Sequence, residues 1–228
     1  TTEIYTLSLH DALPIFLDAG DLPGLRRSWL NLGRTTMKLL TTLATLIALA
    51  LPATAAELGD DGLHKTAWMR DTFKDLREDL ADANAEGKRL ALIFEQRGCI
   101  YCTKMHNEVF PREDIDSYIT DNFFVVQLNL HGDIEVTDFD GETLSEKNMA
   151  RKWGMLFTPT ILFMPQEVPE DATAQSAAVA MMPGAFGAGT TLDMFTWVNE
   201  KRYTLDNEED FQRYHARRIQ ERGDGSFD

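Results

Sequence analysis

The two cysteines of the chain, Cys99 and Cys102, lie in the stretch FEQRGCIYCTKMH, three positions apart. Closing so short a loop removes little entropy from the unfolded chain, so this spacing argues against a structural disulfide. An apolar run of strand length precedes the pair, and a helical pattern follows it. Cys99 is therefore expected near a helix N-terminus, where backbone N–H groups favour a thiolate. Cys102, one turn further on, is placed to resolve a mixed disulfide.

The segments around the cysteines predict a βαβ unit. Apolar spacing over residues 66–86 predicts an amphipathic helix that ends at Gly87. The runs 90–94 and 123–130 are continuous enough to be central strands covered on both faces. Between them we expect a helix with a break at Pro111, which makes the two strands parallel.

The rest of the chain predicts further elements of one compact domain. Residues 131–145 form a polar insertion, in which Asp140-Gly141 suggests a hairpin turn. A helix capped by Ser145, a strand from Thr160 to Met164, a short strand within 177–184 and a closing helix over 191–203 follow. Five aromatic residues lie at predicted strand and helix positions, and we interpret most of them as core: Phe123, Phe124, Trp153, Phe157 and Phe163.

The ends of the chain differ from its centre. Residues 37–55, MKLLTTLATLIALALPATA, have the basic start, apolar run and small-residue A-x-A site of a secretory signal peptide. The apolar run is short of the ~20 residues that a membrane-spanning helix needs. We interpret residues 1–36 as a translated leader foreign to the native protein, 56–205 as the domain and 206–228 as a charged extension. This predicts a periplasmic protein, in a compartment where disulfides persist.

The net charge of −15 argues against nucleic acid as a partner, because such binders place Lys and Arg against phosphates. The first 55 residues contain equal numbers of acids and bases, so this charge falls on the later part of the chain. We expect a monomer that needs no cofactor.

A second motif strengthens the redox interpretation. Thr158-Pro159 comes just before a predicted strand, some sixty residues after the cysteines. The motifs GCIYC and FTPT, in this order and spacing, resemble the thioredoxin superfamily, whose C-x-x-C faces a cis-proline loop. The longer runs FEQRGCIYCTKMHNEVFP and FFVVQLNLHGDIEVTDFDGETLSEKNMARKWG resemble more closely the periplasmic SoxW-type thioredoxins of the sulfur-oxidation system, over residues 66–205.

This resemblance implies an α/β thioredoxin fold, with a mixed sheet flanked by helices, a small insertion after the second strand and a C-terminal helical extension. It implies that Cys99 is the exposed nucleophile, that Cys102 is the resolving thiol and that Pro159 is cis. Thr158 would offer backbone hydrogen bonds to a substrate polypeptide. The implied partners are a Sox sulfur-carrier protein with a C-terminal cysteine arm and a membrane thiol transporter that donates electrons.

The chain departs from the W-C-G-P-C pattern of cytosolic thioredoxins. Ile100 and Tyr101 replace Gly-Pro, where we expect partner contact or tuning of the redox potential. Ile93 occupies the position of the buried acid that accepts the proton of the second cysteine. Glu95 can replace that acid if its side chain points beneath the cysteines, because a poorly solvated carboxylate can exchange protons near neutrality. The alternative is an acid exposed at the strand end.

Three other functions compete with a disulfide reductase. The same chemistry can serve a disulfide oxidase or isomerase. A non-catalytic copper or thiol carrier is the third, since Cys99, Cys102, Met105 and His106 are soft ligands for Cu(I). The second ligand pair that structural zinc demands is missing, and we expect no metal. We interpret His106 as an exposed or capping residue and Met105 as a core residue.

Overall fold

A computed structural model describes residues 57–205 and 209–223 of the chain. The chain divides into the units Thr1–Ala53 and Thr54–Asp228, and all described residues belong to the second. The predicted leader and signal peptide lie outside the described residues. Within them, no helix combines the length and the apolar character needed to span a membrane.

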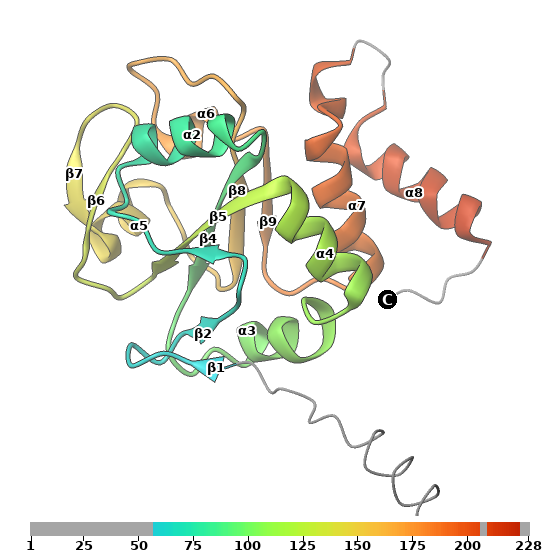
Figure 1. Cartoon of the computed structure of the whole chain (residues 1–228), viewed down its shortest axis with the longest axis horizontal. Coiled ribbons are helices and arrows are strands. Elements are labelled where there is room, and N and C mark those ends of the chain that lie inside the picture. The colour runs from blue at the N-terminus through green and yellow to red at the C-terminus, as the bar shows by residue number, and fades with distance from the viewer. Residues whose placement is uncertain (1–56, 206–208, 224–228) are drawn as a thin grey trace, which may run out of the picture. The chain divides into compact units, whose positions relative to one another are not determined.

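A mixed sheet of five strands organises the fold, in the order β3-β5-β4-β8-β9 (Figure 1). Strands β3, Met69–Arg70, and β4, Arg89–Glu95, run parallel to β5, Phe123–Asn129, which lies between them. Strands β8, Thr160–Phe163, and β9, Ala180–Pro183, continue the sheet antiparallel to β4. All seven residues of β4 are buried, which confirms the predicted central strand.

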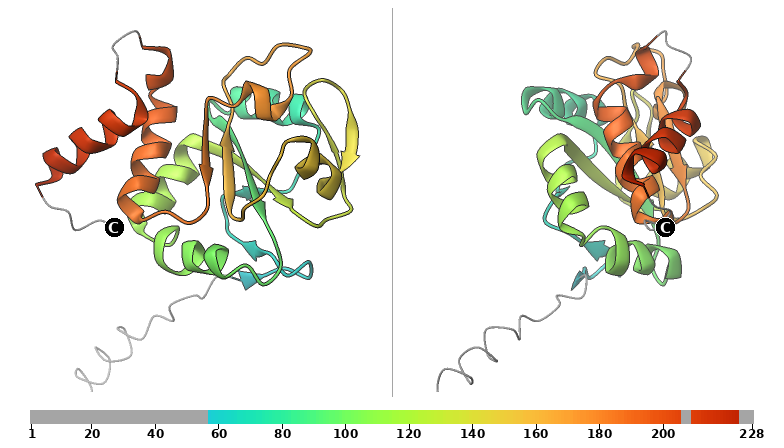
Figure 2. Two further views of the ribbon diagram at one scale, coloured as in Figure 1. Left: turned by 180° about the vertical axis from the view of Figure 1, so that it is seen from behind. Right: turned by 90° about the vertical axis from the view of Figure 1, so that its right-hand side faces the viewer.

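Helices cover both faces of the sheet (Figures 1 and 2). On one face, α2, Leu76–Ala85, α5, Glu146–Lys152, and α6, Ala174–Ala177, pack with alternate residues of β4 and β5. The other face is covered by the C-x-x-C helix with α4, Glu113–Asn122, and α7, Ala188–Asn199. Since alternate side chains of a strand point to opposite faces, Ile93 and Glu95 point toward the side of the C-x-x-C helix.

The predicted insertion and extension are both present. Strands β6, Glu135–Thr137, and β7, Thr143–Ser145, form the small hairpin. After α7 and the 3-10 turn η2, Arg202–Thr204, helix α8, Phe211–Arg222, packs on α7 and buries Tyr214. At the start of the described part, β1, Glu57–Leu58, and β2, His64–Lys65, form another short hairpin. The thioredoxin-like architecture expected from the resemblance is thus confirmed.

The predicted helix over residues 66–86 is wrong in its first half. Helix α2 begins only at Leu76, with Asp75 as its N-cap, and Lys74 before it has a φ of 59°. A left-handed residue interrupts a helix, so the segment before it forms a turn and the edge strand β3. Trp68 packs on the sheet face opposite to that of Leu76, although their spacing suggested one helix face.

Candidate redox site

Cys99 and Cys102 form a disulfide directly after β4. Cys99 is the N-cap of α3, Ile100–Lys104, and the backbone N–H of Cys102 donates to Cys99 Sγ at 3.0 Å. The same N–H can stabilise a thiolate on Cys99 after reduction, because hydrogen bonds to an ionised sulfur are stronger than those to a neutral one. The backbone geometry of the pair therefore favours Cys99 as the nucleophile.

The proline loop meets this sulfur from the other side. The Thr158–Pro159 peptide bond is cis. The Thr158 hydroxyl donates to Cys99 Sγ at 3.3 Å, and the Thr158 carbonyl oxygen lies 3.4 Å from the same sulfur. Two segments far apart in sequence therefore converge on Cys99.

A pocket of about 670 Å³ opens at Cys99. Its rim carries apolar side chains that are largely exposed: Ile100 (74%), Tyr101 (58%), Leu156 (78%) and Phe157 (62%). Phe157 is the exception among the five aromatic residues of which most were interpreted as core, because this side chain lies on the loop before β8 and borders the pocket. Phe123, Phe124, Trp153 and Phe163 are buried as expected.

Cys99 itself is less accessible than the resemblance implied, since only 4% of its surface is exposed. The proline loop against its sulfur accounts for this difference, and access runs through the pocket. Gly98, where cytosolic thioredoxins have tryptophan, has a φ of 72°. This left-handed conformation favours glycine and explains the departure.

Glu95 is completely buried at the end of β4, so the exposed alternative is wrong. Its Oε1 accepts a hydrogen bond from His106 Nε2 at 2.8 Å, and its Oε2 accepts one from Gln127 Nε2 at 2.6 Å. Lys65 Nζ donates to Gln127 Oε1 at 2.8 Å, which fixes the orientation of the amide. Both carboxylate oxygens thus accept a hydrogen bond, one from an imidazole and one from an amide.

His106 is buried too, which contradicts its interpretation as an exposed or capping residue. His106 is the second residue of η1, the π-helical turn Met105–Val109 that continues α3. The ring of His64, from β2, stacks on it with centroids 4.4 Å apart and an interplanar angle of 9°. His64 Nε2 lies 3.3 Å from Thr103 Oγ1, which donates to the Cys99 carbonyl at 3.1 Å. Burial lowers the pKa of His64, with His106 adding to the effect and Glu95 opposing it.

The ligand atoms of His64, Glu95 and His106 lie within 4.8 Å of one another. An imidazole nitrogen binds a metal in the plane of its ring, so two nearly parallel stacked rings do not direct their lone pairs at one ion. The copper ligand set considered from the sequence is not assembled in this form, because Cys99 and Cys102 are joined in a disulfide and Met105 lies in the core, as expected. In this geometry the cluster is a hydrogen-bond network.

A second buried carboxylate, Asp193 of α7, holds the C-terminal helix. It accepts hydrogen bonds from His215 at 2.7 Å and from Arg222 at 2.7 and 2.9 Å, and a longer one from Arg218 at 3.4 Å. Burial alone would raise the pKa of Asp193, but these donors outweigh burial and lower it. The role of this carboxylate is to join α7 to α8.

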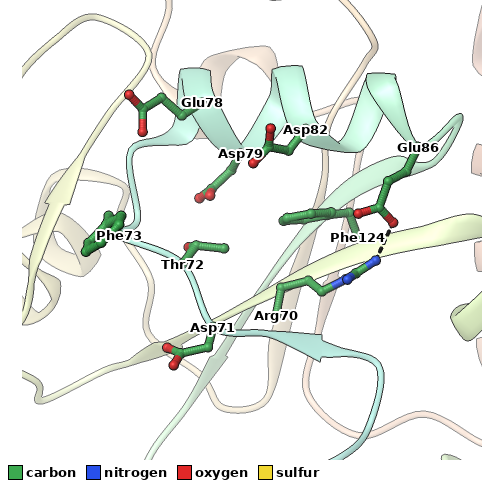
Figure 3. Close-up of a pocket in the computed structure, with 9 residues that line it drawn as sticks. All are labelled: Arg70, Asp71, Thr72, Phe73, Glu78, Asp79, Asp82, Glu86 and Phe124. Carbon is green, nitrogen blue, oxygen red and sulfur yellow. Dashed lines mark hydrogen bonds and ion pairs between the residues drawn. The ribbon is translucent and has the colours of Figure 1, made fainter.

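A third, Asp79, points from α2 into a separate pocket of about 440 Å³ beside β3 (Figure 3). One of its oxygens has no hydrogen-bond partner among the described residues. Burial raises the pKa of Asp79 to about 6, helped by neighbouring carboxylates and opposed by a hydrogen bond from Thr72. The predicted site residues lie elsewhere, and the other residues that line this pocket are Arg70, Asp71, Thr72, Phe73, Glu78, Asp82, Glu86 and Phe124.

The structure brings together Cys99, Cys102, Thr158 and Pro159, with Ile100 and Tyr101 at the pocket rim. Sequence reasoning missed the roles of His64, His106 and Gln127. His106 had a usable signal, because it follows Cys102 by four residues in a predicted helix and so shares its face. His64 and Gln127 had none, since a hairpin outside the βαβ unit and a central strand bring them to the site.

Residues 76–177 match the family described as thioredoxin-like domain. Solved structures similar to the chain include a thioredoxin-fold protein from Helicobacter pylori, with 16% identity and a TM-score of 0.46 over 72% of this chain and 93% of that one. A thioredoxin from Thermus thermophilus has 21% identity and a TM-score of 0.42 over 54% and 83% of the two chains. The oxidised C-terminal domain of DsbD from Neisseria meningitidis has 12% identity and a TM-score of 0.36 over 53% and 89%. A search of curated proteins gives no significant match. The sheet order with helices on both faces, together with the family match over residues 76–177, identifies the fold as a thioredoxin fold.

Proposed function

We propose that the protein is a thiol–disulfide oxidoreductase that reduces disulfides of a partner protein. The observation that carries this proposal is the Cys99–Cys102 disulfide, with the Thr158 hydroxyl and carbonyl directed at Cys99 Sγ. The pocket at this sulfur, with its exposed apolar rim, suits an extended polypeptide more than a small polar molecule.

The reaction begins from the reduced protein. The Cys99 thiolate attacks a sulfur of the partner disulfide, and the first partner thiolate leaves. Cys102 then loses its proton and attacks Cys99, which releases the second partner thiolate. The partner gains the two electrons that the dithiol loses, and Cys99–Cys102 is left as a disulfide. Glu95 belongs to the buried site that accepts the Cys102 proton, and a second dithiol resets the pair.

We further propose the setting that the sequence resemblance suggests. The partner is a periplasmic sulfur-carrier protein with a cysteine on a C-terminal arm, and a membrane thiol transporter supplies the electrons. An arm of this kind matches a pocket at Cys99 whose rim carries Ile100, Tyr101, Leu156 and Phe157. The signal-peptide pattern of residues 37–55 supports the periplasmic location.

The test of the activity is insulin reduction by residues 56–228 with a chemical reductant. We expect turnover by the wild type and none by Cys99→Ser, whereas His215→Gln, remote from the disulfide, serves as a folded control. Full activity of Cys99→Ser would refute the proposal. The direction of electron flow is tested by the reduction potential, since a value close to ~−270 mV favours a reductant and ~−120 mV an oxidase.

A further inference from the structure

We propose that His106 is the proton acceptor for Cys102, and that Glu95 and His64 position it. This inference rests on the proposed function and refines its proton transfer. His106 is held by a hydrogen bond to a buried carboxylate. Its Nε2 lies 2.8 Å from Glu95 Oε1, whose other oxygen already accepts from Gln127. A carboxylate accepts, so Nε2 carries a proton, and whenever the imidazole is neutral its lone pair is on Nδ1.

The nitrogen Nδ1 of His106 is buried and has no hydrogen-bond partner among the described residues. Leaving a buried polar atom unsatisfied is costly, so such an atom calls for an explanation. In the oxidised form neither cysteine carries a proton. In the reduced form the Cys102 thiol would offer a donor to this nitrogen.

His106 follows Cys102 by four residues along the chain. Cys102 is in α3, and His106 lies where η1 continues the helix. Residues four apart lie on one helix face, and a helical side chain leans over the turn that precedes it. The imidazole is therefore placed over the turn that contains Cys102, and both residues are buried.

His64 completes the arrangement from outside the helix. Its ring covers one face of His106, and its Nε2 donates to Thr103 Oγ1, because the single hydroxyl proton of Thr103 goes to the Cys99 carbonyl. Besides His64, the titratable or charged groups recorded in this network are Glu95 and the Lys65 ammonium, which reaches it through Gln127. His64 and Glu95 are thus positioning residues for a nucleophile, base and carboxylate arranged in series.

Resolution of the mixed disulfide moves one proton and replaces one S–S bond with another. In the mixed disulfide, Cys102 Sγ–H gives its proton to His106 Nδ1, and the thiolate forms a bond to Cys99 Sγ. The bond between Cys99 and the partner breaks, and the partner leaves as a thiolate that takes a proton from water. The imidazolium, paired with Glu95, returns its proton to Cys102 when the disulfide is reduced again.

The experiment mixes the reduced protein with 5,5′-dithiobis(2-nitrobenzoate), which releases one coloured thiolate on attack by Cys99 and a second on resolution by Cys102. In His106→Gln we expect the second phase to slow about 100-fold near neutral pH and to speed up with hydroxide, since general base catalysis contributes roughly 10²–10⁴-fold. The first phase should stay within about threefold of the wild type. The matched control is His215→Gln, which removes the other buried carboxylate–histidine pair and should leave both phases unchanged.

Equal slowing of both phases, or an unchanged second phase in folded His106→Gln, would overturn the role of His106. In either case, a normal first phase in the wild type keeps the proposed function intact. A wild type without any first phase refutes the function itself. If His106→Gln does not fold, nitrogen NMR of the wild type decides. Nδ1 should change from an unprotonated to a protonated nitrogen on oxidation, and identical spectra in the two states would refute the proposal.

Discussion

Two buried carboxylates in this fold each hold a histidine whose ring stacks on another ring. Glu95 holds His106 against His64, and Asp193 holds His215 against Phe211, with interplanar angles of 9° and 7°. The pairs differ in their remaining partners. Asp193 also binds the guanidinium groups of Arg222 and Arg218, whereas Glu95 binds the amide of Gln127.

This difference separates a structural pair from one suited to proton transfer. A permanent cation stabilises the ionised carboxylate at every physiological pH, and the pKa of Asp193 is lowered accordingly. A neutral amide leaves the charge of the other pair to be set by a proton. Burial and a histidine therefore do not by themselves define a redox-linked site. Such a site is defined by the remaining partners of the carboxylate and by the neighbouring disulfide.

The largest effect is expected from Asp193→Asn, which removes the buried negative charge that accepts hydrogen bonds from Arg222 and His215. We expect a loss of about 2–4 kcal/mol in the free energy of unfolding at pH 7, less than for fully buried pairs because Arg218 is partly exposed. Since the folded-state pKa is lowered, the contribution is present above the ordinary value of 3.8 and is lost as the pH falls through the folded-state value. Urea unfolding at several pH values measures it, and an unchanged midpoint would contradict the structural role.

We expect substitution of Glu95 to slow catalysis and the equivalent substitution of Asp193 to leave it unchanged. Glu95→Gln keeps an acceptor for His106 but removes the negative charge that stabilises an imidazolium. We expect the resolution of the mixed disulfide to slow roughly 10-fold to 100-fold, as for the loss of part of a general-base system. Asp193→Asn should leave that rate unchanged at a temperature where it is folded. Stopped-flow kinetics compare the two, and equal rates in both variants would remove the distinction.

Asp79 is a third case, a buried carboxylate with one oxygen that has no hydrogen-bond partner in the described part of the chain. Its pKa is raised from 3.8 to about 6, so the folded state binds a proton more tightly than the unfolded state does. The ionised form costs stability, and this cost grows as the pH rises from about 4 to 6 and is constant above it. Asp79→Asn should therefore stabilise the protein by about 1–2 kcal/mol at pH 7, allowing for the open pocket, and have no effect near pH 3.5. Destabilisation at pH 7 would show that Asp79 makes favourable contacts when charged.

The smallest effect concerns the titration of His64. Burial and the adjacent His106 lower its pKa below the ordinary 6.5, so its NMR titration midpoint should lie at lower pH. In His106→Gln, the loss of the neighbouring imidazole should raise this midpoint toward 6.5. A wild-type midpoint above 6.5 would contradict the described packing.

Sequence patterns predicted the cysteine pair and four of the five strands of the sheet, all except β3, because these are local signals. The apolar run of β4, the C-x-x-C spacing and the break at Pro111 each lie within a few residues of the element they specify. The helix predicted over 66–74 failed because spacing cannot report that Lys74 adopts a left-handed conformation. The buried polar cluster was not predictable as a whole, since Glu95, His106 and His64 meet only through the packing of three separate elements.

The roles of Cys99 as the nucleophile and of Cys102 as the resolving thiol are tested most directly by trapping the mixed disulfide. The variant Cys102→Ser is mixed with a disulfide-bonded substrate, and the covalent product is identified by its mass and by peptide mapping. We expect a stable mixed disulfide at Cys99. The double variant that carries both Cys99→Ser and Cys102→Ser should form none. A Cys102→Ser protein that forms no adduct, although its Cys99 reacts with a small alkylating reagent, would contradict it.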